Sequence, residues 1–303
     1  MDVVETCGLA KAFGAKRAVD QFDMHVRQGD IYGFVGRNGA GKTTVMRMIA
    51  GLAEPTAGEV RVFGASPREA GAARRIGVLV ETPGLYGSMS AYDNLMLKAL
   101  ALGLVDPKEK ARELLEFTGL GQMGGKKTKH FSMGMKQRLG LALALLGDPD
   151  LLLLDEPLNG LDPEGAREIR QLVMQLNDQR GITVVVSSHV LEQLGKMATR
   201  YGVIREGRMV RELSAAEVET ECSDFLQVEA ANPQLALAVL QERFPDLRIQ
   251  ALPDGSLRVF GGADAGAVGA ALNEAGIAVS GLYAHKRDLE EFFVEMMGAE
   301  YRG

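Results

Sequence analysis

The first third of the chain changes its pattern of apolar and polar residues twice. Residues 1–30 alternate apolar and polar positions around two turn signals, which predicts short antiparallel strands. Ile31 to Val35 is a continuous apolar run typical of a buried strand. From Thr43 the apolar residues recur at helical spacing until about Gly51. The order predicted here is antiparallel strands, a buried strand, a glycine-rich loop and a helix.

The middle of the chain combines helical periodicity with two short apolar runs. Helices are predicted over residues 90–120 with a break at Asp106-Pro107, after Ser132, and over Pro163 to Leu176. Leu151 to Leu154 and Ile182 to Val186 are apolar runs that end in polar residues, as buried parallel strands do. Together these patterns predict an α/β fold with a parallel sheet.

The pattern shifts again beyond about Leu213. The predicted elements, in order, are a strand at Phe225 to Ala230, a helix at Pro233 to Phe244, strands at Leu247 to Ala251 and Leu257 to Phe260, a helix at Ala265 to Ala275, a strand at Ile277 to Tyr283 and a helix at Asp288 to Met297. Asp254-Gly255 favours a hairpin between the middle two strands. This βαββαβ order with a final helix predicts a small ferredoxin-like α+β domain.

Composition places the chain among ordinary soluble globular proteins. Its 303 residues are 46% hydrophobic and 24% charged, which predicts a core of roughly 200 residues plus a smaller part. The 34 basic and 40 acidic side chains give a net charge of −6, the wrong sign for wrapping nucleic acid, so no nucleic-acid partner is expected.

The cysteines and the apolar runs indicate in which compartment the protein resides and whether it spans a membrane. Cys7 and Cys222 lie far apart without metal-like spacing, so neither a disulfide framework nor a zinc site is indicated and a reducing cytoplasm fits. The first 13 residues are not expected to be a secretory signal. The most apolar stretch, Leu139 to Leu146, is far shorter than the roughly 20 residues of a transmembrane helix. Any role at a membrane would therefore require a partner.

The loop between the buried strand and the first helix matches the pattern G-x-x-x-x-G-K-[ST] at every fixed position. Its glycines allow successive backbone N–H groups to face phosphates at a helix N-terminus, Lys42 adds positive charge for the β- and γ-phosphates, and the Thr43 hydroxyl suits Mg²⁺. A chance glycine turn is the alternative. We expect a nucleoside triphosphate, ATP, to bind the following residues: Gly36, Arg37, Asn38, Gly39, Ala40, Gly41, Lys42, Thr43 and Thr44.

Two carboxylates follow the apolar run at Leu151. Asp155 and Glu156 would lie at the carboxyl edge of the sheet, where open α/β folds bind ligands. We expect Asp155 to hold Mg²⁺ and Glu156 to polarise or deprotonate the attacking water. The expected catalytic residues are Glu156, His189 and Lys42. Taken alone, the Asp-Glu-Pro sequence is also good turn chemistry.

His189 ends the second apolar run on the same sheet edge. It is predicted to reach the γ-phosphate, although a single histidine is more often structural and the four histidines form no metal cluster in sequence. Ser132 precedes a helical pattern and is a natural N-cap, which by itself indicates only a capped helix.

Taken in order, these motifs make residues 1 to about 215 resemble an ATP-binding subunit of the ABC transporter family. In that family the segment matching residues 131–135 is a signature sequence, which implies that Ser132 and Gly134 cap the γ-phosphate of ATP held by a second subunit. The resemblance further implies that Phe13 stacks on adenine rather than serving only as core, that residues 159–162, with Asp162, cross the dimer interface, and that His189 is the switch histidine.

Two of the motifs depart from the family pattern. Glu81 stands where the family has a glutamine, and its carboxylate is expected to meet Mg²⁺ while repelling the γ-phosphate more than an amide would. Met133 and Met135 replace glycine and glutamine of the signature. These departures, with residues 83–86 and the carboxyl-terminal extension, resemble the drug, bacitracin and lantibiotic exporters of the family, in which residues 86–97 would lie beside a coupling helix of the membrane subunit.

The resemblance implies a P-loop ABC ATPase core with an antiparallel β subdomain and a helical subdomain. The expected domains are residues 1–215, with the helical subdomain at about 85–145, and an accessory domain at residues 216–303. The implied function is ATP hydrolysis that energises export through a separate membrane permease, by a homodimer at the cytoplasmic face of the cell membrane. A soluble ABC ATPase without a transport role and a low-turnover regulatory ATP binder are the alternatives.

Overall fold

The computed structural model describes residues 1–80, 83–222, 224–285 and 289–298. The chain forms two compact units, one made chiefly of Met1–Ala215 and the other of Ala216–Glu295. Each unit has its own buried apolar cluster. None of the helices in the described ranges is long and apolar enough to cross a membrane.

A six-stranded sheet forms the centre of the first unit. Its strands are β3 (Ile31–Val35), β5 (Ile76–Leu79), β6 (Leu151–Asp155), β7 (Thr183–Ser188), β8 (Arg200–Arg205) and β9 (Arg208–Ser214). The order is β5-β6-β7-β3-β8-β9, and all neighbours are parallel except β8 and β9. Strands β3, β6 and β7 are buried along their whole length, which explains their continuous apolar runs.

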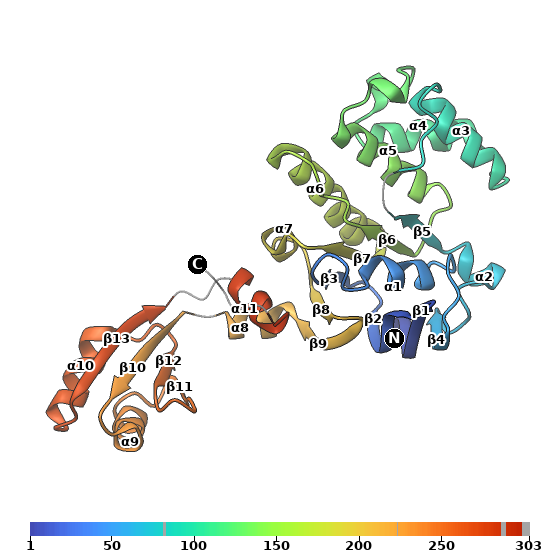
Figure 1. Ribbon diagram of the computed structural model, residues 1–303. Coiled ribbons are helices and arrows are strands. Elements are labelled where there is room, and N and C mark those ends of the chain that lie inside the picture. Colours follow the sequence, from blue (N-terminus) through green and yellow to red (C-terminus); the bar gives the residue numbers. More distant parts are fainter. Residues whose placement is uncertain (81–82, 223, 286–288, 299–303) are drawn as a thin grey trace. The chain divides into compact units, whose positions relative to one another are not determined.

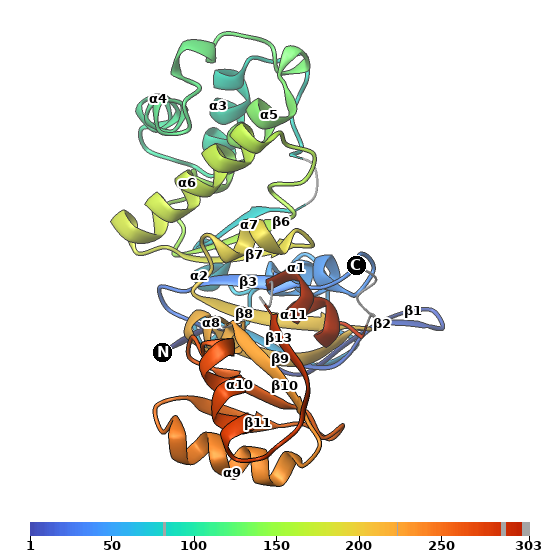
Figure 2. The ribbon, with the colours of Figure 1, turned by 90° about the vertical axis from the view of Figure 1, so that its left-hand side faces the viewer.

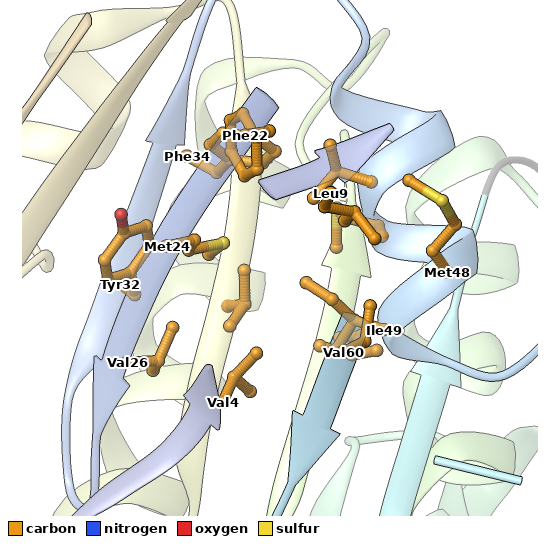
Figure 3. Close-up of a cluster of buried hydrophobic side chains, with 14 of the residues drawn as sticks. Val4, Leu9, Phe22, Met24, Val26, Tyr32, Phe34, Met48, Ile49 and Val60 are labelled. Carbon is orange, nitrogen blue, oxygen red and sulfur yellow. The ribbon is translucent and has the colours of Figure 1, made fainter. Parts of the chain in front are cut away.

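An antiparallel sheet of three strands belongs to the same unit. It consists of β1 (Asp2–Phe13), β2 (Lys16–Arg27) and β4 (Ala57–Val62), in the order β2-β1-β4. The strands predicted here were short, whereas β1 and β2 each run for 12 residues, because bulges absorb the irregular stretches without ending the pairing. The apolar sides of β1, β2 and β4 meet β3 and the first helix in one core (Figure 3).

Helices cover the six-stranded sheet on both faces. Helix α1 (Lys42–Ile49) lies on one face with the antiparallel sheet, and α6 (Pro163–Arg180) and α7 (Leu191–Gly195) lie on the other (Figures 1 and 2). A short helix, α2 (Ala70–Ala73), precedes β5. Helix α6 runs four residues beyond the predicted end at Leu176 and stops at Gly181, which adopts a left-handed φ of 65°.

A separate group of helices joins β5 to β6. The group contains α3 (Ala91–Ala101), α4 (Pro107–Phe117), α5 (Met133–Leu145) and 3₁₀ turns at Gly121–Met123 and Thr128–His130. The three α-helices pack against one another (Figure 1). Ser90 and Asp93 form a capping box at the start of α3, and Pro107 opens α4 at its first turn, as the break predicted.

The second unit has the predicted βαββαβ order. Its elements are α8 (Ala215–Glu221), β10 (Phe225–Ala230), α9 (Pro233–Arg243), β11 (Arg248–Ala251), β12 (Leu257–Phe260), α10 (Ala265–Glu274), β13 (Val279–His285) and α11 (Leu289–Met296). The sheet order is β11-β12-β10-β13, with every pair antiparallel. Side chains of α9 and α10 fill one face of this sheet and form its core.

Candidate functional site

The glycine-rich loop between β3 and α1 has a backbone that other residues would not tolerate. Gly39 and Gly41 have φ angles of 80° and 114°. A Cβ on Gly41 would lie 2.8 Å from the carbonyl oxygen of Ala18, and one on Gly36 would lie 2.5 Å from Cγ2 of Ile204. Both conformation and space therefore require glycine, and the loop leaves backbone N–H groups at the start of α1.

Lys42 is the first residue of α1 and is almost completely buried. Its Nζ donates hydrogen bonds to the carbonyl oxygens of Gly36 at 2.6 Å and Arg37 at 3.4 Å. The same ammonium lies 3.2 Å from Glu156 Oε1. The loop is thus folded around the Lys42 ammonium. A phosphate chain lying against the loop would also interact with this positive charge.

Asp155 is the last residue of β6 and brings together side chains from two other elements. Its Oδ2 accepts a hydrogen bond of 2.6 Å from the Thr43 hydroxyl on α1. Its Oδ1 accepts one of 2.5 Å from the Ser187 hydroxyl on β7. A buried carboxylate beside a threonine hydroxyl supplies the oxygen ligands that Mg²⁺ prefers, so these residues fit that ion.

Glu156 follows with a left-handed backbone, φ 50°, that turns its side chain toward Lys42. Its Oε2 is hydrogen bonded to Nδ1 of His189 at 2.8 Å. Its Oε1 is buried, lies 3.2 Å from the Lys42 ammonium and has no hydrogen-bond partner among the described residues. A carboxylate with one free lone-pair site at the sheet edge has the chemistry of a general base for water.

A cleft of about 340 Å³ lies in front of the loop. Its wall includes Phe13 and Lys16 from the antiparallel sheet, several loop residues, Thr43, Thr44 and Glu156. Phe13 exposes 57% of its surface there, with the Lys11 ammonium 5.2 Å from the ring centroid. An exposed aromatic face on the cleft wall suits stacking on a planar base better than a place in the core.

The remaining predicted ligands line a different pocket. Ser132, Gly134 and Asp162 surround a cavity of about 530 Å³ between the starts of α5 and α6. Ser132 caps α5 by accepting from the Met135 N–H, and Asp162 caps α6 by accepting from the Gly165 N–H. None of these three lines the cleft at the glycine loop, and Glu81 lies outside the described residues.

Ser187 is a site residue that the sequence-based prediction omitted. It lies opposite Asp155 in the β6–β7 pairing and is completely buried. The available signal was a serine at the end of the apolar run, two residues before His189. Its partners, however, are set by the pairing of strands that are far apart in sequence.

Among the described residues no cluster of three histidines, cysteines or carboxylates suggests a further metal site.

The fold and the site together define a P-loop ATPase: a glycine loop links a parallel strand to a helix, and a carboxylate pair ends a nearby strand. A sequence model of the ABC transporter family matches residues 19–159. The bacitracin transport ATP-binding protein BcrA of Bacillus licheniformis is 38% identical over 98% of this chain and 97% of its own.

Two further proteins extend the comparison. The lantibiotic transport ATP-binding protein SrtF of Streptococcus pyogenes is 38% identical over 67% of this chain and 87% of its own. A dimeric ATP-binding cassette in a post-hydrolysis state with ADP and Pi superposes with a TM-score of 0.64, at 25% identity, over 70% of this chain and 98% of its own. The chain belongs to the ATP-binding subunits of the ABC transporter family, and is an ATPase that binds nucleotide.

Proposed function

We propose that this chain is the ATPase subunit of an exporter of peptide antibiotics or related compounds. It would act as a homodimer with a separate permease, at the cytoplasmic face of the cell membrane. The export of such compounds is supported by the full-length similarity to a bacitracin transport subunit and by the match to a lantibiotic transport subunit. The transport roles of these relatives support peptide antibiotics as the class of exported compound. The arrangement of the site supports ATP hydrolysis as the mechanism.

The chemistry at the loop follows from the charges described above. Lys42 and the loop N–H groups would bind the phosphates, while Thr43 and Asp155 would hold Mg²⁺. The bound ion would neutralise phosphate charge. Glu156 would take a proton from water, and His189 would hold the Glu156 carboxylate in place through their 2.8 Å contact.

The separation of the two pockets is the observation that carries the dimer. Ser132 and Gly134 place a capped helix N-terminus, an anion-binding feature, where the same chain has no glycine loop. Asp162 lies beside them at the start of α6. Two copies related by a two-fold axis would present each loop to the other copy's α5, so that each nucleotide would be held by both chains.

A groove on the helical subdomain is the proposed contact with the permease. Pro83, Tyr86, Leu97, Lys98 and Gly140 contribute to a groove of about 330 Å³ between α3 and α5. Tyr86 and Leu97 expose 60% and 43% of their surfaces. Burial lowers the pKa of Lys98, whose side chain lines this groove. The apolar surface with a single ammonium fits an amphipathic helix that ends in carbonyl or carboxylate oxygens.

The proposed domain limits are residues 1–215 for the ATP-binding domain, with its helical subdomain at about 85–145, and residues 216–303 for an accessory domain. The separate cores of the two compact units support this division. For the accessory domain we propose a role in dimer contact or regulation. We further propose that Glu81 contacts the metal and that Glu81, Met133 and Met135 affect the rate of turnover.

The dimer is tested with the Glu156→Gln variant, because slowed hydrolysis would keep ATP between the subunits. We expect light scattering after gel filtration to show a dimer with ATP and a monomer without it. Ser132→Arg in the same background should abolish that dimer, since a bulky cation would fill the α5 pocket. A Glu156→Gln protein that stays monomeric at saturating ATP would contradict the proposal.

A further inference from the structure

Ser187 links the two carboxylates of the site through one hydroxyl group. Its Oγ donates to Asp155 Oδ1 at 2.5 Å and accepts from the backbone N–H of Glu156 at 2.9 Å. The carbonyl oxygen of Ser187 lies 3.2 Å from the same N–H. One donor and one acceptor position are therefore both used, on a side chain with no exposed surface.

The hydrogen bond to the Glu156 N–H is placed where the backbone needs support. Glu156 adopts a φ of 50°, a conformation that is unfavourable for a residue with a Cβ. That turn directs the carboxylate to Lys42 and His189. Strand β7 and the residue after it thus hold Glu156 twice, at its backbone through Ser187 and at its side chain through His189.

The hydrogen bond to Asp155 acts on the other carboxylate. Asp155 has one oxygen fixed by Thr43 and the other by Ser187, so its plane cannot rotate without breaking a bond. Three hydrogen bonds thus form a continuous chain from the Thr43 hydroxyl through the Asp155 carboxylate and the Ser187 hydroxyl to the Glu156 N–H. Outer partners of this kind orient the groups that hold a metal.

We infer that Ser187 is a positioning residue that sets the orientation of the Mg²⁺-binding Asp155 and of the base Glu156 at the same time. The inference rests on the roles proposed for these two carboxylates. Ser187 is not among the described residues that line the cleft in front of the glycine loop. Its loss should therefore weaken metal binding and turnover together and leave nucleotide binding without metal intact.

The test compares Ser187→Thr with Ser187→Val, because threonine and valine have the same shape and differ only in the hydroxyl. Mn²⁺ binding is measured by electron paramagnetic resonance with a non-hydrolysable ATP analogue, and kcat and KM for ATP are measured by phosphate release. For the valine variant we expect Mn²⁺ affinity and kcat to fall by about 10–100-fold. The threonine variant should stay close to wild type, and neither should change nucleotide affinity in EDTA.

Ser188→Ala is the matched control, since the hydrogen bonds of the neighbouring hydroxyl within the described ranges go to the backbone of Val190. It should leave Mn²⁺ affinity unchanged. Equal Mn²⁺ affinity in the valine and threonine variants would overturn the inference. If circular dichroism shows that both are unfolded, Ser187→Ala decides instead: wild-type Mn²⁺ affinity in that variant overturns the inference, and reduced affinity supports it.

Failure of this inference can be distinguished from failure of the proposed site. If Glu156→Gln abolishes turnover while valine and threonine at position 187 behave alike, only the role of Ser187 is wrong. If Glu156→Gln retains wild-type turnover, Glu156 is not the base, and the proposed site itself is wrong.

Discussion

Glu156 shows how a single residue can depend on contacts from several elements. Its backbone is held by β7, one carboxylate oxygen faces Lys42 on α1, and the other contacts His189 beyond β7. Lys42 is itself bound to the loop carbonyls, so the positive charge near Glu156 is fixed in position. One carboxylate oxygen has no hydrogen-bond partner within the described part of the chain, so it can accept a proton from water, as a general base must.

The first prediction concerns this residue. Replacing Glu156 by Gln removes the base but keeps the shape, so steady-state ATP turnover should fall by about 10²–10⁴-fold. ATP affinity, measured by fluorescence titration, should stay near wild type because the phosphate ligands remain. Glu192→Gln removes a largely exposed carboxylate on α7 that pairs with Lys196 and should leave turnover unchanged. Wild-type turnover in Glu156→Gln would exclude the base role.

The antiparallel sheet forms one wall of the nucleotide cleft. Within this sheet, β1 and β4 approach each other closely at one point. The pairing of β1 with β4 shifts register between Cys7 and Ala10. Gly58 on β4, with φ 75°, lies so close to this irregularity that a Cβ would be 2.2 Å from the carbonyl oxygen of Gly8. Phe13 lies at the end of the same strand β1 and lines the cleft.

The second prediction tests this close approach of β1 and β4. Gly58→Ala should lower the free energy of unfolding by at least ~3 kcal/mol, since the backbone carbonyl cannot move aside without disturbing β1. Gly64→Ala is the matched control, because Gly64 has a similar φ of 77° but open space around a Cβ. It should cost about 1–2 kcal/mol from backbone strain alone. Urea unfolding measures both, and equal losses would contradict a steric role for Gly58.

At the scale of the whole molecule, the predicted ligands divide between two separate pockets, and an apolar groove lies on the helical subdomain. In the proposed dimer, each nucleotide site would be completed by residues of the second chain. The proposed assembly of two such chains and a permease would complete the site and cover the groove. ATP-driven closure of the two chains would then act on the permease through the subdomain that carries the groove.

The third prediction concerns the groove. Leu97→Asp places a charge on an exposed apolar position of α3, so co-purification with the permease should be lost. The ATPase activity of the isolated subunit should be unchanged. Leu52→Asp, at another exposed leucine near the end of α1, should not affect co-purification. If Leu97→Asp still binds the permease as tightly as wild type, the permease contacts a different surface.

Local sequence determined more of this fold than of the site. Buried strands β3, β6 and β7, helix α1 and the βαββαβ order of the second unit follow from periodicity and turn residues, which depend on neighbours along the chain. Strands β4, β5, β8 and β9 were not predicted. Arginines at both ends of β8 and within β9 leave only short apolar runs, and the two strands are held together by their antiparallel pairing.

The glycine loop, Lys42, Asp155 and Glu156 were identifiable from sequence because each lies at a strand end beside its own motif. Only the tertiary structure decided which of them meet. Thr43 and Asp155 are 112 residues apart and Glu156 and His189 are 33 apart, and the strand order β6-β7-β3 brings them together. Ser187 acquires its partners in the same way. Long-range strand pairing sets these contacts, and no periodicity along the chain encodes the order of strands in a sheet.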